Sequence, residues 1–175
     1  MDNSKIITKR LILRKPSRTD RQALFEIHGD PNTNRFNPSG PHKSVEESET
    51  MLRKWLEHWQ KYDFGYWVIT TRTEPHKIIG CGGLMYKQIA HARRANLYFR
   101  FRTSAWGKGY ATEMAKMSRQ LGFKKLGLQQ IAALVRPGNK PSIRLLERLR
   151  MIQRGIIKDK KGSFYFYVLD QNTSE

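Results

Sequence analysis

Apolar side chains recur with two different periods along the chain, and these periods predict strands and helices. Residues 6–14 (IITKRLILR) are apolar and β-branched enough to predict a first strand. Residues 96–102 alternate strictly, with Leu97, Phe99 and Phe101 on one side of the expected strand and Tyr98, Arg100 and Arg102 on the other. Two further strands are expected between these, at Tyr66–Thr71 and Ile78–Met85. Their short connections favour an antiparallel meander.

Helical spacing appears first between these strands. Ser17 and Asp20 offer capping oxygens for a short helix that ends near His28, and residues 29–43 predict a loop because they gather Gly, Pro and Asn. Residues 44–47 (SVEE) match a capping box. The helix that they open carries one apolar stripe, made of Leu52, Trp55, Leu56 and Trp59. We interpret both tryptophans as core residues.

The second half of the chain alternates helices and strands. A helix is expected from about Gly109 to Leu121, a strand over residues 130–136, and a turn at residues 137–139. Pro141 suits the first turn of a second helix, and residues 164–169 predict a final strand. The expected fold is one mixed α/β domain over residues 1–175: antiparallel strands followed by a β-α-β-α-β tail.

Composition and charge narrow the class of protein. The chain has 175 residues, of which 38% are hydrophobic, and this favours a folded globule. It lacks an apolar run of membrane-spanning length and a secretory leader, and its one cysteine, Cys81, excludes an internal disulfide. The five histidines show no metal-ligand spacing. We therefore expect a cytoplasmic protein without a metal or a membrane partner.

The net charge of +18 is the unusual feature of the composition. Such a field attracts anions over long range, among them nucleic acid, the ribosome, an anionic membrane surface, and an anionic cofactor or substrate. A basic surface that serves only solubility is an equally good interpretation, and the charge alone does not choose among these.

A glycine-rich turn precedes the helix expected at Gly109. Gly107 and Gly109 let the backbone approach an anion, Lys108 adds charge, and the helix N-terminus presents unpaired N–H groups. The turn lacks the Gly-Lys-Ser/Thr ending of a Walker loop, and it follows several antiparallel strands, unlike a dinucleotide-binding fingerprint. Taken alone it predicts either a phosphate cradle or a plain tight turn.

Three segments together resemble a known family. Residues 8–14 (TKRLILR), 106–113 (WGKGYATE) and 139–149 (NKPSIRLLERL) are similar, in order and spacing, to the motifs of the GNAT (Gcn5-related N-acetyltransferase) superfamily, especially the RimJ/RimL-type branch that acetylates ribosomal proteins. The resemblance implies a mostly antiparallel twisted sheet, splayed between two parallel strands and flanked by about four helices. It also implies acetyl-coenzyme A as the co-substrate.

The resemblance also assigns cofactor contacts. The pyrophosphate would bind the loop and helix start, pantetheine would pair with the backbone of one splayed strand, Asn139 would contact the pantetheine arm, and Arg148 would reach an adenosine phosphate. The implied cofactor-binding residues are Phe99, Arg100, Phe101, Trp106, Gly107, Lys108, Gly109, Tyr110, Ala111, Thr112, Asn139 and Arg148. A backbone N–H near Phe99 would steady the oxyanion.

The implied reaction is direct attack of a primary amine on the acetyl thioester. Ser142 occupies the motif position that implies the acid for the leaving thiolate, although a first-turn helix residue explains it equally well. Asn96 stands where the family often has a glutamate base, so another group or water must take the proton. Glu113 fits dipole stabilisation of a helix, and Glu46, Glu47 and Glu49 fit a solvated helix surface.

The acceptor side is less defined by the sequence. Arg150 replaces the glycine that usually ends the second helix, which predicts a reshaped corner. A protein N-terminus and a small amine both fit as acceptors, and the +18 charge disfavours a polyamine unless an acidic pocket compensates. The alternative class is a basic RNA- or ribosome-binding module that keeps the fold with little catalysis. Either a monomer or a homodimer is compatible with the sequence.

Overall fold

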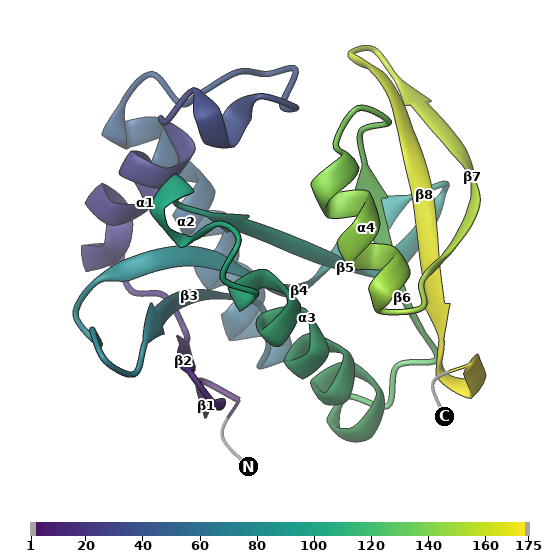
Figure 1. Cartoon of the computed structure of the whole chain (residues 1–175), viewed down its shortest axis with the longest axis horizontal. Helices are drawn as coiled ribbons and strands as arrows, with labels where there is room; N and C mark the ends of the chain where they lie inside the picture. The colour runs from purple at the N-terminus through teal and green to yellow at the C-terminus, as the bar shows by residue number, and fades with distance from the viewer. Residues whose placement is uncertain (1–2, 174–175) are drawn as a thin grey trace.

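The computed structural model describes residues 3–173, and within them the strands form one eight-stranded sheet (Figure 1). The strand order is β1-β2-β3-β4-β5-β6-β8-β7, and all neighbours are antiparallel except β5 and β6. The strands are β1 Lys5–Ile7, β2 Leu11–Arg14, β3 Tyr66–Thr71, β4 Ile78–Ile89, β5 Ala92–Phe101, β6 Gln130–Val135, β7 Ile152–Asp159 and β8 Gly162–Asp170. The expected fold class is confirmed, while the expected domain limits of 1 and 175 lie outside the described residues.

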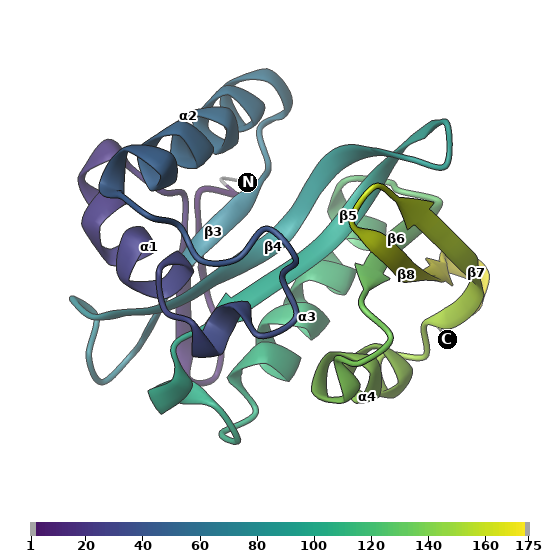
Figure 2. The same ribbon diagram turned by 90° about the horizontal axis from the view of Figure 1, so that it is seen from above.

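The four α-helices lie on both faces of this sheet (Figure 2). They are α1 Arg21–His28, α2 Val45–Tyr62, α3 Tyr110–Gln120 and α4 Lys140–Arg148. Helices α1 and α2 cover one face, where Leu24, Leu52 and Trp55 pack on the middle strands, and α3 and α4 cover the other. Trp55 and Trp59 are 4% and 2% exposed, which confirms them as core residues.

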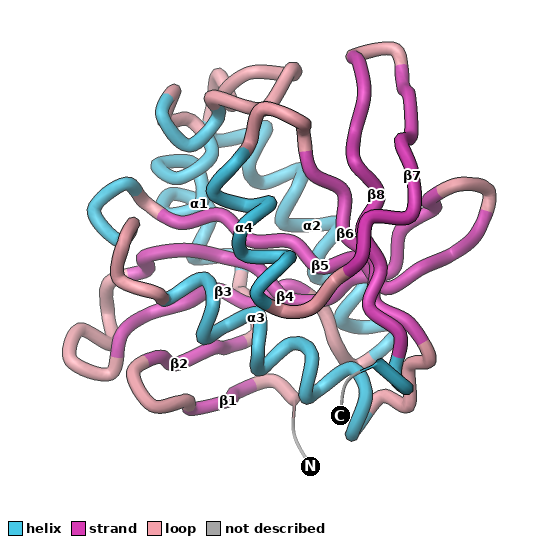
Figure 3. The backbone as a smooth tube through the Cα atoms, turned by 45° about the vertical axis from the view of Figure 1, so that its right-hand side comes forward, coloured by secondary structure: helices cyan, strands magenta, loops and turns pink. Residues whose placement is uncertain are grey.

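The prediction of one continuous strand over residues 6–14 is wrong. The structure divides residues 6–14 into β1 and β2, two short antiparallel strands joined by a turn (Figure 3). The Thr8 backbone N–H donates to the Leu11 carbonyl at 2.9 Å, and the Leu11 N–H donates to the Thr8 hydroxyl at 3.1 Å. These bonds close the turn at Thr8, Lys9 and Arg10, the polar residues that interrupt an otherwise apolar segment.

Two strand predictions fall short for local reasons. The β4–β5 hairpin runs longer than expected because Ala90 and His91 form its turn with φ of 50° and 63°, a conformation that Asn and Gly usually mark. Strand β7 has no counterpart among the expected elements. It is an edge strand with mostly exposed side chains and a register shift between Gln153 and Gly155, so it shows no apolar alternation.

The corner after α4 is not reshaped, contrary to what Arg150 led us to expect. Arg150 adopts a left-handed φ of 64°, where glycine is usual. Its N–H donates to the Glu147 carbonyl at 2.8 Å, and the Met151 N–H donates to the Leu146 carbonyl at 3.0 Å. These two bonds form a Schellman motif, so the helix keeps its glycine-type ending although arginine occupies the position.

Candidate cofactor and acceptor site

The parallel strands β5 and β6 separate after a very short contact. They pair only at Ala95 with Ile131 and at Asn96 with Ala132. Beyond this point β5 continues to Phe101 while still pairing with β4, and β6 continues to Val135 while pairing with β8. Figure 1 shows the two strands diverging. Among the described strands, none pairs with the edge of β5 from residue 97 to residue 101 on its β6 side, and this edge can accept an extended ligand.

Phe99 and Phe101 lie on this open segment and face α3 and α4. Phe99 packs against both core clusters on that face, one around α4 and β8 and one around α3 and β2. Ala111 also touches both clusters. These residues of the predicted cofactor set therefore lie where the two halves of the sheet meet.

The loop that follows β5 leads directly to the N-terminus of α3. Gly107 and Gly109 both take left-handed φ, at 73° and 75°, and residues 106–109 are exposed. The first helical hydrogen bond runs from the Glu113 N–H to the Gly109 carbonyl at 3.1 Å. The N–H groups of Tyr110, Ala111 and Thr112 therefore lack helical acceptors and present a positive end.

Two side chains fix this loop. The Trp106 indole is 53% exposed, but its Nε1 donates to the Phe101 carbonyl at 3.0 Å. The Arg10 guanidinium, from the β1–β2 turn, donates to the Lys108 carbonyl at 2.8 Å and to the Glu113 carboxylate at 2.7 Å. Glu113 is thus a structural anchor for the loop. Burial raises the pKa of its carboxyl group, but hydrogen bonds from Thr8 and Arg10 outweigh this and lower the pKa overall.

The start of α4 lies directly after β6. The Asn139 side chain caps the helix, since its Oδ1 accepts the Ser142 N–H at 3.2 Å. The Ser142 hydroxyl is partly buried and has no hydrogen-bond partner among the described residues. Arg148 is exposed at the opposite end of α4, roughly 13 Å from Asn139 along the helix axis. Asn139 and Ser142 thus lie at one end of the helix and Arg148 at the other.

The other face of β5 carries a buried polar cluster that the sequence prediction missed. Asn96, at the point where the strands separate, is 4% exposed, and its Nδ2 donates to the Tyr66 hydroxyl at 3.1 Å. The Asn96 amide is the donor in this bond, and an amide is not a base. Asn96 therefore positions the Tyr66 hydroxyl and does not take up a proton. Tyr98 packs against Trp55 and Tyr66 on the same face.

Histidines from α1 and the following loop complete this cluster. His28 Nδ1 lies 2.9 Å from the Leu24 carbonyl, which can only accept, so Nδ1 carries the proton and Nε2 accepts from the Tyr98 hydroxyl at 3.1 Å. Burial, assisted by the charge of Arg100, lowers the pKa of His28 to about 3. His42 stacks on His28 with ring centroids 5.1 Å apart, and burial lowers its pKa too.

The loop between α1 and α2 closes this side. Asn34 Oδ1 accepts from Arg100 Nη1 at 2.6 Å, and Ser39 accepts from Lys161 of the β7–β8 turn at 2.5 Å. Phe36 lies beside Gly138, where a Cβ would meet its ring at 3.6 Å. The loop therefore contacts both sides of the split, by which we mean the opening between the diverging strands β5 and β6: Arg100 on one side, and Gly138 and Lys161 on the other. A polar residue on the buried face of the first helix, His28 beside Leu24 and Ile27, was the available sequence indication of this cluster.

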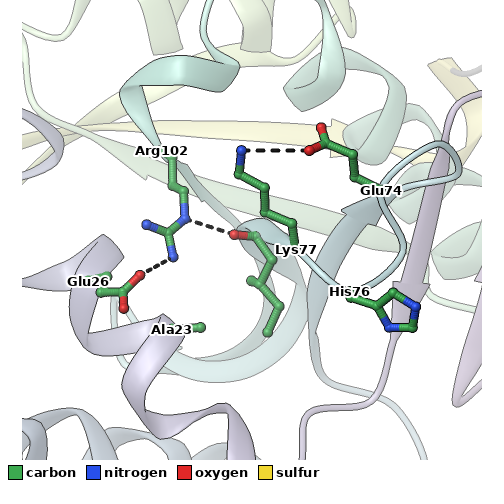
Figure 4. A pocket seen from close by; sticks show the side chains of 7 residues that line it. Ala23, Glu26, Glu74, His76, Lys77 and Arg102 are labelled. Carbon is green, nitrogen blue, oxygen red and sulfur yellow. Dashed lines mark hydrogen bonds and ion pairs between the residues drawn. The ribbon is translucent and has the colours of Figure 1, made fainter.

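Two surface depressions lie elsewhere. One of about 530 Å³ adjoins the end of β5, and Figure 4 shows its charges paired within it: Arg102 with Glu26 at 2.6 Å, and Lys77 with Glu74 at 3.7 Å. The other follows the outer surface of α2. Its acidic lining residues, Glu46, Glu49 and Glu57, are exposed on the helix side away from the buried Trp55 and Trp59.

Three further properties bear on the chemistry. Burial raises the pKa of the Cys81 thiol to about 12, which makes it a poor nucleophile at neutral pH. Between residues 3 and 173, no three His, Cys, Asp or Glu side chains lie together in a group that could hold a metal ion. Within the same range, no helix combines the length and apolar character that crossing a membrane requires.

Comparison with known proteins connects this geometry to a family. The family model described as an acetyltransferase (GNAT) domain matches residues 10–152. The chain is 30% identical to the uncharacterized N-acetyltransferase p20 of Bacillus licheniformis over 155 residues, covering 88% of this chain and 85% of the relative.

Solved structures show the same fold at low sequence identity. The ribosomal-protein-S5-alanine acetyltransferase of Vibrio fischeri superposes with a TM-score of 0.75 at 19% identity, covering 98% of each chain. A mutant form of the spermidine N-acetyltransferase SpeG of Vibrio cholerae gives 0.72 at 19% identity, covering 95% of this chain and 97% of its own. The family model and the relative from Bacillus licheniformis favour an acetyltransferase over a non-catalytic RNA-binding module. The chain belongs to the GNAT acetyltransferase family.

Proposed function

We propose that this protein transfers the acetyl group of acetyl-coenzyme A directly to a primary amine. The observation that carries the proposal is the open edge of β5 from residue 97 to residue 101, which leads into the N-terminus of α3. Pantetheine amides match the free N–H and C=O groups of an unpaired strand, and a pyrophosphate matches the unpaired N–H groups of a helix start.

In the proposed complex the thioester lies near Phe99. The backbone N–H there polarises the acetyl carbonyl, and the amine attacks from the α1–α2 side of the sheet, where Tyr98 and Arg100 project. Ser142 donates a proton to the leaving thiolate. Its hydroxyl suits this role because it has no other described partner and stands at the end of α4 that also carries Asn139.

The proton released by the amine needs an acceptor other than Asn96. His28 does not serve, because its pKa of about 3 makes it a very weak base and its Nε2 already accepts from Tyr98. Water and His42 remain as acceptors. In this scheme the amine binds as its neutral form or loses its proton through water before attack.

The acceptor is a protein N-terminus, as in the RimJ/RimL-type branch, or a small amine. A polyamine fits poorly with a net charge of +18. The acidic residues that could compensate, Glu46, Glu49 and Glu57, line the outer surface of α2 and do not face β5. The structure of this family member therefore supports acceptors without several positive charges.

Two measurements on the purified chain test the proposal. Acetyl-coenzyme A at about a hundred times its dissociation constant should raise the melting temperature by about 5–10 °C. Mass spectrometry should then detect an added acetyl group on some amine in a panel of peptides with free N-termini, amino acids and small amines. The absence of both the thermal shift and any acetylated product would refute the proposed function.

A further inference from the structure

A cation without a carboxylate partner stands on the acceptor side of the split. Arg100 follows Phe99 on β5, and strand alternation directs its side chain toward the face covered by α1 and α2. Its Nη1 donates to Asn34 Oδ1 at 2.6 Å. In the described part of the chain, no carboxylate lies within 4.0 Å of this guanidinium, whereas Arg102, two residues further along, pairs with Glu26 at 2.6 Å.

The groups around Arg100 are all uncharged at neutral pH. His28 is neutral, and burial keeps the hydroxyl of Tyr98 and the thiol of Cys81 protonated. The positive charge of Arg100 lowers the pKa of both His28 and His42. The one carboxylate whose charge acts on His42 is Glu47, which is exposed and accepts the Lys43 N–H at 3.0 Å.

The contact with Asn34 holds the guanidinium in place without neutralising it. Asn34 Nδ2 donates to the His28 carbonyl at 2.7 Å and to the Asp30 carbonyl at 2.8 Å, which fixes the amide orientation and points Oδ1 toward Arg100. A guanidinium has five N–H donors, and a single amide oxygen uses only part of this capacity. A partly buried cation with spare donors binds a carboxylate more strongly than a neutral group.

We infer that Arg100 binds an anionic group of the acceptor, so that the preferred substrate is a primary amine that carries a carboxylate a few bonds from the nitrogen. The inference rests on the proposed function, because it places the acceptor beside the thioester at Phe99. Phe99 and Arg100 are consecutive residues of β5, so one small molecule, or one acidic N-terminal segment, that places its amine beside Phe99 presents its carboxylate toward the Arg100 side of the strand. The net charge of +18 attracts such acceptors.

Matched acceptor pairs test this inference. Each pair has the same amine with either a carboxylate or a carboxamide: free amino acids against their amides, and peptides with Asp or Glu in the second position against those with Asn or Gln. We expect kcat/KM to be at least about tenfold higher for the carboxylate member. A preference confined to amino acids identifies a small substrate, and one confined to peptides identifies a protein N-terminus.

Substitutions at Arg100, on β5, and at Arg102, just after the end of β5, separate recognition from general charge. Arg100→Gln should reduce the carboxylate preference to about one. Because Arg100 also belongs to the implied cofactor site, acetyl-coenzyme A affinity is measured on the same variant, and both acceptors of each pair are compared at saturating acetyl-coenzyme A. Arg100→Lys should retain part of the preference. Arg102→Gln removes the same charge and should leave the preference unchanged. Thermal melting of each variant monitors the loss of the Asn34 contact.

The outcomes distinguish this inference from the function beneath it. A wild-type protein that acetylates amines but does not prefer carboxylate acceptors overturns the role of Arg100 alone. An Arg100→Gln variant that keeps the preference does the same. A protein that binds no acetyl-coenzyme A and acetylates no amine overturns the proposed function, and the role of Arg100 with it.

Discussion

Arg10 and Glu113, which are 103 residues apart in sequence, join the β1–β2 turn to the start of α3. The Arg10 backbone N–H donates to Glu113 Oε1 at 2.8 Å, and the Thr8 hydroxyl donates to the same oxygen at 2.6 Å. The Arg10 guanidinium also holds the Lys108 carbonyl, so the expected pyrophosphate loop depends on a residue outside it.

Glu113→Ala should therefore weaken acetyl-coenzyme A binding. The lost bonds free the Lys108 segment to move, and we expect about a threefold to tenfold higher dissociation constant and a loss of about 1–2 kcal/mol in unfolding free energy. Calorimetric titration and denaturant unfolding measure the two quantities. Glu74→Ala removes an equal charge from the exposed pair with Lys77 and should change neither; equal effects in both variants would contradict the anchoring role.

Gly109→Val should abolish measurable cofactor binding while the protein still folds. The side chain would project from a left-handed position at the helix start, where the pyrophosphate is expected. Gly127→Val is the matched control, because Gly127 also has a positive φ, 62°, and a Cβ there meets nothing within 4 Å. Both variants carry similar backbone strain, so normal affinity in Gly109→Val would refute the assignment of the loop.

Ser142→Ala should lower kcat by about tenfold or more and leave the acetyl-coenzyme A dissociation constant nearly unchanged. The expected reason is the loss of the proton donor to the leaving thiolate. Ser142→Thr retains a hydroxyl and should recover part of the rate. Unchanged turnover in the alanine variant would reduce Ser142 to an ordinary residue of the first turn of α4.

Arg150→Gly should stabilise the protein. The left-handed conformation at this position strains arginine but not glycine, and the two Schellman hydrogen bonds use only backbone groups. We expect a gain of about 0.5–1 kcal/mol, or about 1–4 °C in melting temperature. Arg144→Gly, in the regular part of α4, should cost about 1 kcal/mol instead. A lower melting temperature for Arg150→Gly would show that the arginine side chain contributes more than the strain costs.

Acidification should destabilise the protein partly through His28. Its folded pKa of about 3 lies below the usual 6.5, so between these values the unfolded chain binds the proton and the folded chain does not. Stability therefore falls as pH falls from about 6.5 toward 3, and this one group accounts for about 2 kcal/mol between pH 7 and pH 5.

His28→Gln should remove that part of the pH dependence, although it also lowers stability at neutral pH. Urea unfolding at pH 7 and pH 5 gives the comparison. The exposed His76→Gln provides the control and should retain the wild-type pH dependence. The interpretation fails if the His28 variant loses as much stability on acidification as the wild type.

The sequence predicts this fold well where local patterns and burial agree. The alternation from Leu97 to Phe101 and the stripe of α2 both correspond to real faces of the structure. The sequence pattern fails at β7, whose exposed side chains carry no apolar period, and at the turn of Ala90 and His91, whose left-handed backbone lacks the residues that usually mark it. Tertiary pairing determines both elements.

The candidate site also has one part that the local sequence predicts and one part that it does not. The turn around Gly107 and Gly109 is visible locally in the sequence because its two glycines take the left-handed φ values, although Arg10 also holds the loop from outside. The cluster of His28, Asn34 and Arg100 joins α1 and the loop after it to a strand residue that lies 66 positions beyond Asn34. No spacing rule connects these residues, so the chemistry on the acceptor side emerges only once the chain is folded.

Because only two residue pairs join β5 to β6, the sheet consists of two parts with a short connection between them. Strands β1–β5 form one part and strands β6–β8 form the other, and the pairing between the two parts is far shorter than the strands themselves. A pantetheine arm lying along β5 would act as a further strand between the two parts. The binding of acetyl-coenzyme A would therefore extend the hydrogen bonding between the two halves of the sheet, and the departure of coenzyme A would shorten it again.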